Sequence, residues 1–477
     1  MGLAMRGKLQ QVGLIALGAV LGVMISLNFS AVAQRDVLAP LPVEELRAFT
    51  EVFGRIKSDY VEPVADKKLI TEAITGMVAG LDPHSSYLDA DAFRELQVGT
   101  QGEFGGLGIE VGMEDGYVKV VSPIDDTPAA RANIKPGDLI IKLDETAVKG
   151  MTLSDAVKRM RGKPNTKITL TIARKGESKP IIVTLTRAVI KIQSVKSKVI
   201  EPGYAYFRVT QFQEQTGEML AKAIQAAFKE NQGEMRGIVL DLRNDPGGLL
   251  NGAVAVSAAF LPQNALVVYT DGRTDDAKMR LTASPEHYLR GRLKDDYLTK
   301  LPAEVKKVPL VVLVNSGSAS ASEIVAGALQ DHKRAVIMGT QTFGKGSVQT
   351  ILPLGNSTAI KLTTARYYTP NGRSIQAKGI VPDITLDDGT AGRADSGLRM
   401  READLTKHLL NERSEDAAAN RVVPPATNAF NFVPEPRPKD VDEKTTKPQP
   451  GEIVAQNDYE LGQALLFLKR RALARAN

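Results

Sequence analysis

Residues 237–248 read GIVLDLRNDPGG, an apolar run that ends in a turn of charged residues, proline and glycine. A short apolar run bounded by turn residues is typical of a β-strand buried on both faces. The stretch after the turn predicts a helix that ends at Phe260. The same order recurs as a strand at 308–314, a turn of small residues and a helix to about Leu329, followed by a third strand at 335–338. Buried strands joined by helices predict an α/β core with a sheet covered on both faces.

We predict that this α/β core spans residues 189–388. Alternating apolar residues at 358–369 predict a later strand of the sheet. Residues 262–306 are polar, charged and poorly patterned. We therefore expect 262–306 to form a long insertion on the surface.

Residues 102–188 have a different pattern, with short alternating strands and two interleaved helices. This pattern resembles a PDZ domain, a small barrel-like sheet with two helices. The loop before the first strand reads FGGLGI at 104–109. Its backbone N–H groups are suited to hold the terminal carboxylate of a peptide that adds as a strand to the sheet edge. The residues assigned to this role are Gly106, Leu107, Gly108 and Ile109. The predicted strands are 108–111, 117–121, 139–143, 167–173 and 181–186, and the predicted helices are 128–133 and 153–160.

The first 33 residues have the pattern of a targeting segment. A basic start with Arg6 and Lys8 precedes an apolar, charge-free run at 12–27 and the small residues Ala-Val-Ala at 31–33. The apolar run is about 16 residues long, shorter than the roughly 20 of a membrane-spanning helix. We interpret 1–33 as a cleaved signal peptide, with an uncleaved anchor as the alternative. Either reading places the rest of the chain outside the cytoplasm, in the periplasm or cell envelope.

Helices are predicted on both sides of the two central segments. Residues 34–101 form a helical segment, with helices at 44–60 and 66–79 in which apolar residues recur at three- and four-residue spacing. Residues 389–455 are rich in polar residues and proline from 412 onward, which predicts a disordered linker. Residues 456–477 are predicted to form a short amphipathic helix that packs on the body of the chain or on another subunit. The helical segment and the tail helix have the character of subunit contacts, so we expect a homo-oligomer.

Composition excludes several kinds of chemistry. The chain has 477 residues, which suggests roughly three domains. Cysteine is absent, so thiol nucleophiles, disulfides and cysteinyl zinc sites are excluded. The net charge of +6 is spread along the chain without an arginine-rich run interleaved with aromatic residues, so no nucleic-acid partner is expected. We expect neither a metal nor another cofactor.

Ser320 and Lys345 form a candidate nucleophile and base, 25 residues apart. Ser320 lies in a turn of small residues, GSASASE at 317–323, and Lys345 lies between two glycines. A serine hydroxyl needs a base to remove its proton. A lysine amine serves only when neutral, so its pKa of about 10.4 must fall to near 7 through burial. No acidic residue lies in 344–354, and Gln349 could orient the amine without adding charge.

A histidine base is the less favoured alternative. The four histidines are His84, His287, His332 and His408. His332 is the one near Ser320 in sequence, and it follows the predicted helix, so it should face away from that helix's N-terminus. His84 lies in the turn LDPHSSY at 81–87, where we interpret it as a hydrogen-bonded structural support.

Backbone N–H groups near Ser320 predict an oxyanion hole. Ser320 should begin a helix, where free N–H groups and the positive dipole end favour a developing negative charge. Ala321 is one predicted donor. The second should come from the glycine turn at Gly247 or Gly248, which ends a strand of the parallel sheet, where α/β sites form.

Each of these motifs alone also has a structural explanation. The serine turn with Glu323 fits a helix capping box, and a Gly-Lys-Gly turn is often solvated. Their joint occurrence resembles the carboxyl-terminal processing peptidases, also called tail-specific proteases, over residues 45–388. The motifs that support the resemblance are LDPHS at 81–85, GGLG at 105–108, DLRNDPGG at 241–248, the serine turn, TFGKGSVQ at 342–349 and ARYYTP at 365–370.

The resemblance implies a function and a set of partners. It implies that Ser320, Lys345 and Gln349 form the catalytic set of a serine endopeptidase, and that the PDZ domain docks the C-terminus of protein substrates. Apolar C-termini are the expected substrates, and a lipoprotein adaptor is an implied partner. Two alternatives stay open: a non-catalytic PDZ scaffold on a hydrolase-like body, and a peptidoglycan or ester hydrolase.

Overall fold

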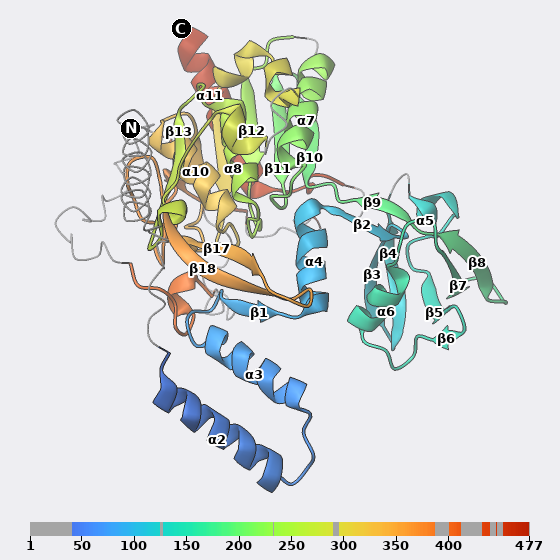
Figure 1. Cartoon of the computed structure of the whole chain (residues 1–477). Coiled ribbons are helices and arrows are strands. Elements are labelled where there is room, and N and C mark those ends of the chain that lie inside the picture. The colour runs from blue at the N-terminus through green and yellow to red at the C-terminus, as the bar shows by residue number, and fades with distance from the viewer. Residues whose placement is uncertain are drawn as a thin grey trace, which may run out of the picture. The chain divides into compact units, whose positions relative to one another are not determined.

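The computed structural model describes residues 41–124, 127–231, 233–289, 295–386, 400–411, 432–438, 445 and 452–476 (Figure 1). The predicted signal peptide at 1–33 lies outside these residues. Within the described ranges, none of the helices combines the length and apolar character needed to cross a membrane. The chain divides into two compact units, one up to Ile74 and one from Thr75 onward, and each is described by itself.

The first unit consists of two helical stretches. Helix α2 (Val43–Asp59) begins with two glutamates in its first turn and has Lys57 in its last, which suits the helix dipole. Helix α3 (Asp66–Ala79) starts in this unit. Both helices agree with the prediction to within one residue. The apolar side of α2 is exposed, at positions Leu46, Phe49, Val52 and Ile56.

The segment that resembles a PDZ domain forms an antiparallel sheet in the order β3-β4-β5-β7-β8, with β6 beside β5. Apolar residues of alternate strand positions face one core, which includes Val118, Ile140 and Leu170. A two-stranded ribbon of β2 and β9 precedes and follows this sheet in the chain. The elements are α4 (Ala90–Gln101), β2 (Glu103–Gly106), β3 (Ile109–Glu114), β4 (Tyr117–Pro123), α5 (Pro128–Arg131), β5 (Leu139–Leu143), β6 (Thr146–Ala147), α6 (Leu153–Met160), β7 (Lys167–Ala173), β8 (Ile181–Thr186) and β9 (Ala188–Lys191).

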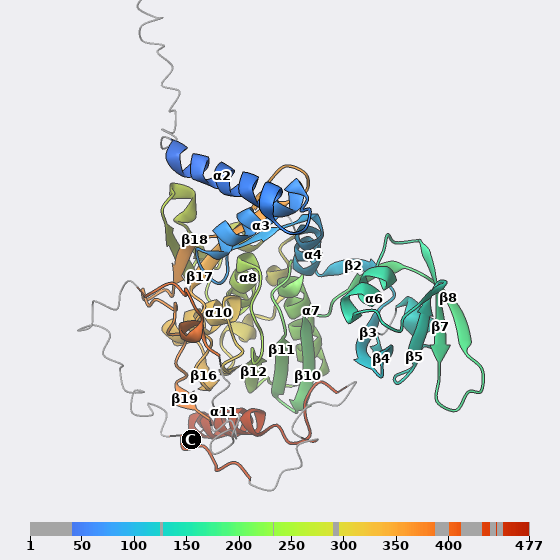
Figure 2. The ribbon, with the colours of Figure 1, turned by 90° about the horizontal axis from the view of Figure 1, so that it is seen from below.

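The predicted α/β core contains a six-stranded sheet in the order β10-β11-β12-β15-β16-β19. All neighbours from β11 onward are parallel, and β10 pairs antiparallel with β11. Figure 2 shows this sheet between α7, α8 and α10 on one side and α11 on the other. The elements are β10 (Val195–Glu201), β11 (Tyr204–Val209), α7 (Thr216–Glu230), β12 (Gly237–Asp241), α8 (Leu250–Phe260), β15 (Leu310–Val314), α10 (Ala321–Asp331), β16 (Val336–Gly339), β19 (Ile384–Thr385) and α11 (Tyr459–Ala476).

A second, antiparallel sheet corrects the prediction of a surface insertion at 262–306. Its strand order is β1-β18-β13-β14, with β17 beside β18. Strand β13 (Leu266–Gly272) pairs with β18 (Ala359–Tyr368), and its residues Val267 and Val268 are buried. The sequence did not reveal β13 because its partner strand lies between 93 and 99 residues later in the chain. The remaining elements are β1 (Ser86–Leu88), η1 (Asp275–Ala277), β14 (Arg280–Thr282), α9 (Pro285–Tyr288), η3 (Tyr297–Lys300), η4 (Ala303–Lys306) and β17 (Ser347–Pro353).

Segments after the core are ordered against it, which corrects the prediction of a disordered linker for the part that the structure describes. Residues 400–411 include a short helix, η6 (Glu402–Asp404), in which Glu402 is buried, and Phe432 is buried as well. The rest of 389–455 lies outside the described residues. Buried side chains anchor these segments although their overall composition is polar.

Helix α11 packs on the core of its own chain. Its residues Leu461, Ala464 and Leu468 lie against the sheet residues Tyr206 and Val311. The helix thus packs on the body of its own chain, which is one of the two partners expected for it, and this apolar face is not the expected subunit contact.

We expect Leu468→Ala to destabilise the protein by about 3 kcal/mol, because the side chain is fully buried and its removal leaves a cavity. Leu473→Ala on the same helix is the matched control, since Leu473 is 67% exposed and should change stability by less than about 0.5 kcal/mol. Urea unfolding followed by circular dichroism measures both. Equal effects of the two substitutions would contradict the docking of α11.

Candidate active site

Ser320 lies at the C-terminal edge of the parallel sheet, at the start of α10. Its backbone has φ 56° and ψ −112°, a left-handed conformation that costs a non-glycine residue about 1–3 kcal/mol. Two hydrogen bonds hold it there: the Ala319 N–H donates to the Asp245 carbonyl at 3.0 Å, and the Ser320 N–H donates to Glu323 Oε2 at 2.8 Å. Hydrogen bonds to Asp245 and Glu323 therefore stabilise the strained backbone of Ser320.

Glu323 connects the serine turn with the lysine loop. Its buried carboxylate also accepts from the N–H groups of Gly344 at 2.7 Å and Lys345 at 2.9 Å, and from the Thr342 hydroxyl at 2.5 Å. Burial raises the pKa of Glu323 to about 7, although these donors favour the ionised form. The glutamate of the predicted capping box thus fixes the backbones of Ser320 and Lys345 together.

Lys345 is partly buried on the loop that enters β17. Burial lowers the pKa of its amine, and the charge of Lys361 lowers it further, whereas Glu402, Glu323 and Asp82 raise it. The sequence around Lys345 lacks acidic residues, but the fold brings these three carboxylates from distant segments. Among the hydrogen bonds of the described residues, none joins Lys345 Nζ to Ser320 Oγ.

Gln349 lies on β17, in register with Thr363 of β18. Its amide Nε2 donates to Ser347 Oγ at 3.0 Å and to Thr363 Oγ1 at 3.3 Å. In the part of the chain that the structure describes, the amide has no bond to Lys345. Gln349 is thus on the same hairpin as the lysine, and its orienting role stays a prediction.

The glycine turn lies directly against the serine turn. The Gly247 N–H donates to Asp245 Oδ1 at 2.9 Å, whereas the N–H groups of Gly248 and Ala321 have no acceptor among the described residues. A Cβ on Gly247 would lie 2.8 Å from both Ala321 N and Ser320 Cβ. Of the two glycines, Gly248 therefore has the available donor, and Gly247 provides the space beside Ser320.

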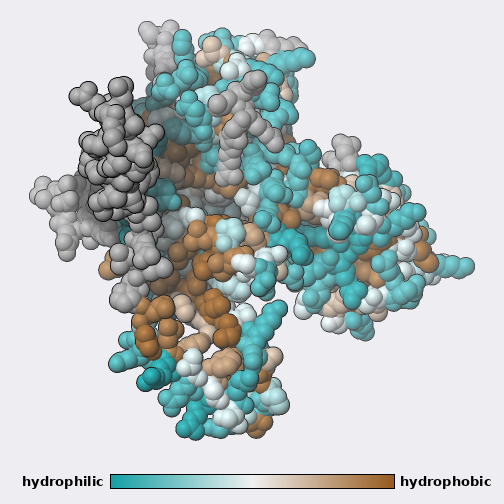
Figure 3. All heavy atoms as spheres, in the orientation of Figure 1, coloured by the Kyte–Doolittle hydropathy of each residue, from teal (hydrophilic) through white to brown (hydrophobic). Residues whose placement is uncertain are grey.

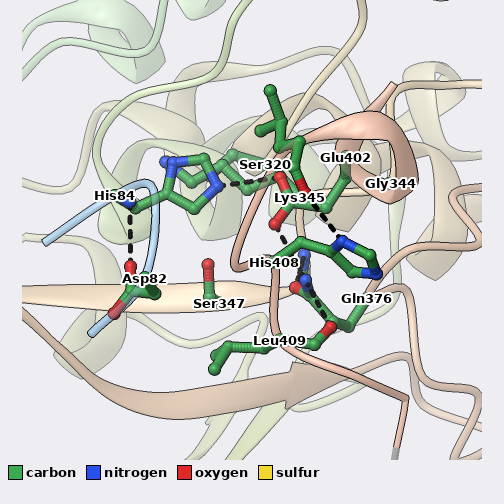
Figure 4. A network of polar contacts seen from close by, with 12 residues as sticks. Asp82, His84, Ser320, Gly344, Lys345, Ser347, Gln376, Glu402, His408 and Leu409 are labelled. Carbon is green, nitrogen blue, oxygen red and sulfur yellow. Dashed lines mark hydrogen bonds and ion pairs between the residues drawn. The ribbon is translucent and has the colours of Figure 1, made fainter. Parts of the chain in front are cut away.

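Several residues near Ser320 and Lys345 were not identified from sequence. The Tyr367 hydroxyl, from β18, lies near the Ser320 side chain and donates to the Lys345 carbonyl. Figure 4 shows Asp82, His84, Gln376 and Glu402 in one polar network around Lys345. The motif ARYYTP contained Tyr367, but nothing in its spacing indicated a contact with Ser320.

Two of the four histidines can be compared with their predicted positions. His332 ends α10 at the end opposite Ser320, and its Nε2 contacts the Leu266 carbonyl at 2.7 Å. This position agrees with the predicted one. His84 Nε2 contacts Glu402 Oε2 at 2.8 Å, so it is a hydrogen-bonded support as predicted, but one within the lysine's surroundings.

The glycine loop of the PDZ-like segment joins β2 to β3. Gly106 ends β2, and Leu107 is buried in the domain core. Gly108 has φ 76°, and a Cβ there would lie 2.3 Å from Thr127. The carbonyls of Leu107 and Gly108 accept from Ala129 N and Ile124 N, while their N–H groups have no acceptor within the described residues. Leu107 can thus contribute its backbone to a binding site, and Ile109 is the partly buried side chain beside it.

The described residues hold no cluster of three or more histidine, aspartate or glutamate side chains suited to bind a metal ion.

Comparisons with known proteins show which families the chain resembles. Residues 203–386 match the model of peptidase family S41, residues 105–185 match a PDZ domain, and residues 25–92 match the N-terminal domain of the activating protease CtpB. The chain is 47% identical over 379 residues to a carboxy-terminal-processing protease of Bartonella bacilliformis, covering 78% of this chain and 82% of that one. It is 36% identical over 343 residues to a probable CtpA-like serine protease of Staphylococcus aureus, covering 72% of this chain and 65% of that one.

A solved structure, the photosystem II D1 C-terminal processing protease, is 29% identical, with a TM-score of 0.40, and the match covers 76% of this chain and 92% of that chain. The match to the Bartonella protein extends across most of both chains and includes the serine turn, the lysine loop and the PDZ segment. The chain therefore belongs to peptidase family S41 and is a serine-type protease of the carboxy-terminal-processing group.

Proposed function

We propose that Ser320 is the nucleophile and Lys345 the general base of an endopeptidase that captures apolar protein C-termini with its PDZ domain and cleaves near them. The observation that carries this assignment is that the backbone N–H groups of Ser320 and Lys345 both donate to the Glu323 carboxylate. These bonds keep the two residues in one site. The N–H groups of Leu107 and Gly108, which have no acceptor among the residues that the structure describes, support carboxylate capture by the PDZ loop.

The proposed reaction follows from this geometry. Neutral Lys345 takes the proton of Ser320 as Oγ attacks the substrate carbonyl, and the N–H groups of Ala321 and Gly248 bind the resulting oxyanion. The C–N bond then breaks, Lys345 returns the proton to the leaving amine, and water hydrolyses the acyl-enzyme with Lys345 again as the base. Because Lys345 Nζ is not bonded to Ser320 here, the flexible lysine side chain turns toward the hydroxyl in the active form, with Gln349 orienting it.

We expect Ser320→Ala and Lys345→Ala each to reduce cleavage of a peptide with a free apolar C-terminus by about 10³-fold or more, because each removes one partner of the proton transfer. Mass spectrometry of the products measures the rate. The same peptide with an amidated C-terminus tests tail capture and should be cleaved more slowly. Equal cleavage by the wild type and Ser320→Ala would contradict the assignment of Ser320 as the nucleophile.

We expect Gly247→Ala to lower kcat by about 10²–10³-fold, since the added methyl group crowds the Ala321 N–H that binds the oxyanion. Binding of a tail peptide to the PDZ domain, measured by fluorescence anisotropy, should not change. Gly462→Ala on α11 is the matched control because a Cβ there meets nothing within 4 Å. If Gly247→Ala retains wild-type kcat, Gly247 does not shape the oxyanion hole.

The two rival functions are less well supported. Family membership and the PDZ match do not favour a non-catalytic scaffold or a peptidoglycan or ester hydrolase. A panel of protein, muropeptide and ester substrates separates them, and turnover restricted to the latter two would favour the hydrolase.

We further propose that the protein works in the periplasm or cell envelope, exported by residues 1–33, and with a lipoprotein adaptor. The basic start and apolar run of the sequence support export, and the family resemblance supports the adaptor. Cell fractionation checks the location, and crosslinking of the Ser320→Ala protein in intact cells checks the adaptor. Recovery of the full-length chain with a cytoplasmic marker would contradict export.

The protein is also proposed to form a homo-oligomer through α2. Hydrophobic residues gather on the surface over this helix, and Phe49 and Val52 are 42% and 58% exposed (Figure 3). A stripe of this kind is suited to pack against the same helix of a second copy.

We expect the double substitution Phe49→Glu and Val52→Glu to lower the oligomer mass measured by light scattering, because it places two charges in the apolar stripe. Glu51→Gln on the same helix is the control and should leave the mass unchanged. An unchanged mass in the double variant would rule out α2 as the contact.

A further inference from the structure

Glu402 lies in the segment that follows the core, yet its carboxylate is in the network of the active site. The side chain is 1% exposed, and its Oε2 accepts from His84 Nε2 at 2.8 Å. Its Oε1 accepts from the Gln376 amide at 2.8 Å. Figure 4 shows Glu402 between the His84 ring and Gln376, beside Lys345.

The segment 400–411 is also connected by hydrogen bonds to the loop that contains Lys345. Gln376 Oε1 accepts from the N–H of Gly346, next to the lysine, at 3.0 Å. The Glu402 N–H donates to the Phe343 carbonyl at 3.1 Å, and the Asn411 amide donates to the Gln376 carbonyl at 3.0 Å. A chain of hydrogen bonds therefore runs from His84 through Glu402 and Gln376 to the backbone beside the base.

Four charged groups from other elements face the Lys345 amine. Lys361 of β18 disfavours the ammonium form, whereas Glu402, Glu323 and Asp82 favour it. The donors to Glu323 are backbone N–H groups and the Thr342 hydroxyl.

Asp82, which faces the lysine from the turn before β1, is also held by neutral donors. Those donors are the N–H groups of His84 and Ser85 and the hydroxyls of Ser85 and Thr363.

Glu402 differs from these two carboxylates, because one of its partners is an imidazole ring, that of His84. Burial opposes ionisation of Glu402, but the bonds from His84 and Gln376, with attraction to His84 and Lys345, hold its pKa below the usual range. His408 of the same segment contacts the Leu405 carbonyl at 2.8 Å instead.

We propose that His84 and Glu402 are positioning residues for the base: Glu402 fixes the Lys345 loop through Gln376, and His84 offsets the charge of Glu402 so that Lys345 can lose its proton. The proposal rests on the assignment of Lys345 as the base. It predicts that removing either partner moves the acidic limb of the pH profile, and in opposite directions.

The test is the rate at which a fluorophosphonate labels Ser320 as a function of pH. In this reaction the serine oxygen bonds to phosphorus, fluoride leaves, and the serine proton passes through Lys345 to solvent, so the rate reports the base without tail binding. Glu402→Gln removes a negative charge near the amine and should lower the midpoint of the acidic limb by about one pH unit. His84→Ala leaves that charge without its partner and should raise the midpoint by a similar amount.

Further variants distinguish an electrostatic effect on the pKa of Lys345 from a general loss of folded structure. The double variant should resemble Glu402→Gln, because His84 has no carboxylate left to offset. His84→Gln, which keeps a hydrogen-bond donor, should shift the midpoint less than His84→Ala. His332→Gln, at the far end of α10, is the control and should leave the midpoint unchanged. If Glu402→Gln does not fold, the comparison of His84→Ala with His84→Gln still tests the proposal.

Midpoints that stay within error of wild type in folded variants, or that move in the same direction in Glu402→Gln and His84→Ala, would overturn the proposal. Loss of labelling in Lys345→Ala together with unmoved midpoints would reject this inference and leave the assignment of the base intact. Undiminished labelling in Lys345→Ala would instead reject the proposed base itself.

Discussion

The buried carboxylate of Glu323 is the constraint on which the active site depends. The serine turn and the lysine loop enter from different sheets, and this side chain accepts hydrogen bonds from the backbones of both. Burying a carboxylate is costly unless its oxygens are well bonded, and charge-assisted bonds to N–H groups are among the stronger ones. The backbones of Ser320 and Lys345 are thus held together by one residue that has no role in the proposed reaction.

The C-terminal segment extends this dependence to the glycine turn. Arg243, in that turn, bonds to Asp241 at 2.7 Å and to Asp458 at 2.7 Å, and it also pairs with Glu460. Because Asp458 and Glu460 begin α11, docking of that helix on the sheet also holds the turn that carries Gly247 and Gly248. Segments that follow the core in sequence are therefore part of the site's support.

Local pattern was enough to predict most of the core elements and to single out the proposed reactive pair, but long-range contacts were not predictable. Apolar runs gave β12, β15 and α6, and residue chemistry singled out Ser320 and Lys345. Strand β13 was missed because its burial depends on β18, and the anchoring of 400–411 was missed because Glu402 lies in a polar stretch. His84 was interpreted as a support, but its partner Glu402 is more than 300 residues away in the chain, so its place near Lys345 could not be inferred.

The charges around Lys345 show why the protonation state of its amine could not be predicted from the neighbouring residues in sequence. The absence of acids in 344–354 suggested an amine made neutral by burial alone. In the folded protein, burial and Lys361 lower the pKa of Lys345, whereas three carboxylates from distant segments raise it. At sites of this kind the interactions of one charge reach several elements, so each carboxylate's own hydrogen bonds decide how strongly it holds the ammonium form. The protonation of Lys345, the proposed base, is therefore a property of the assembled site, including the segment after the core.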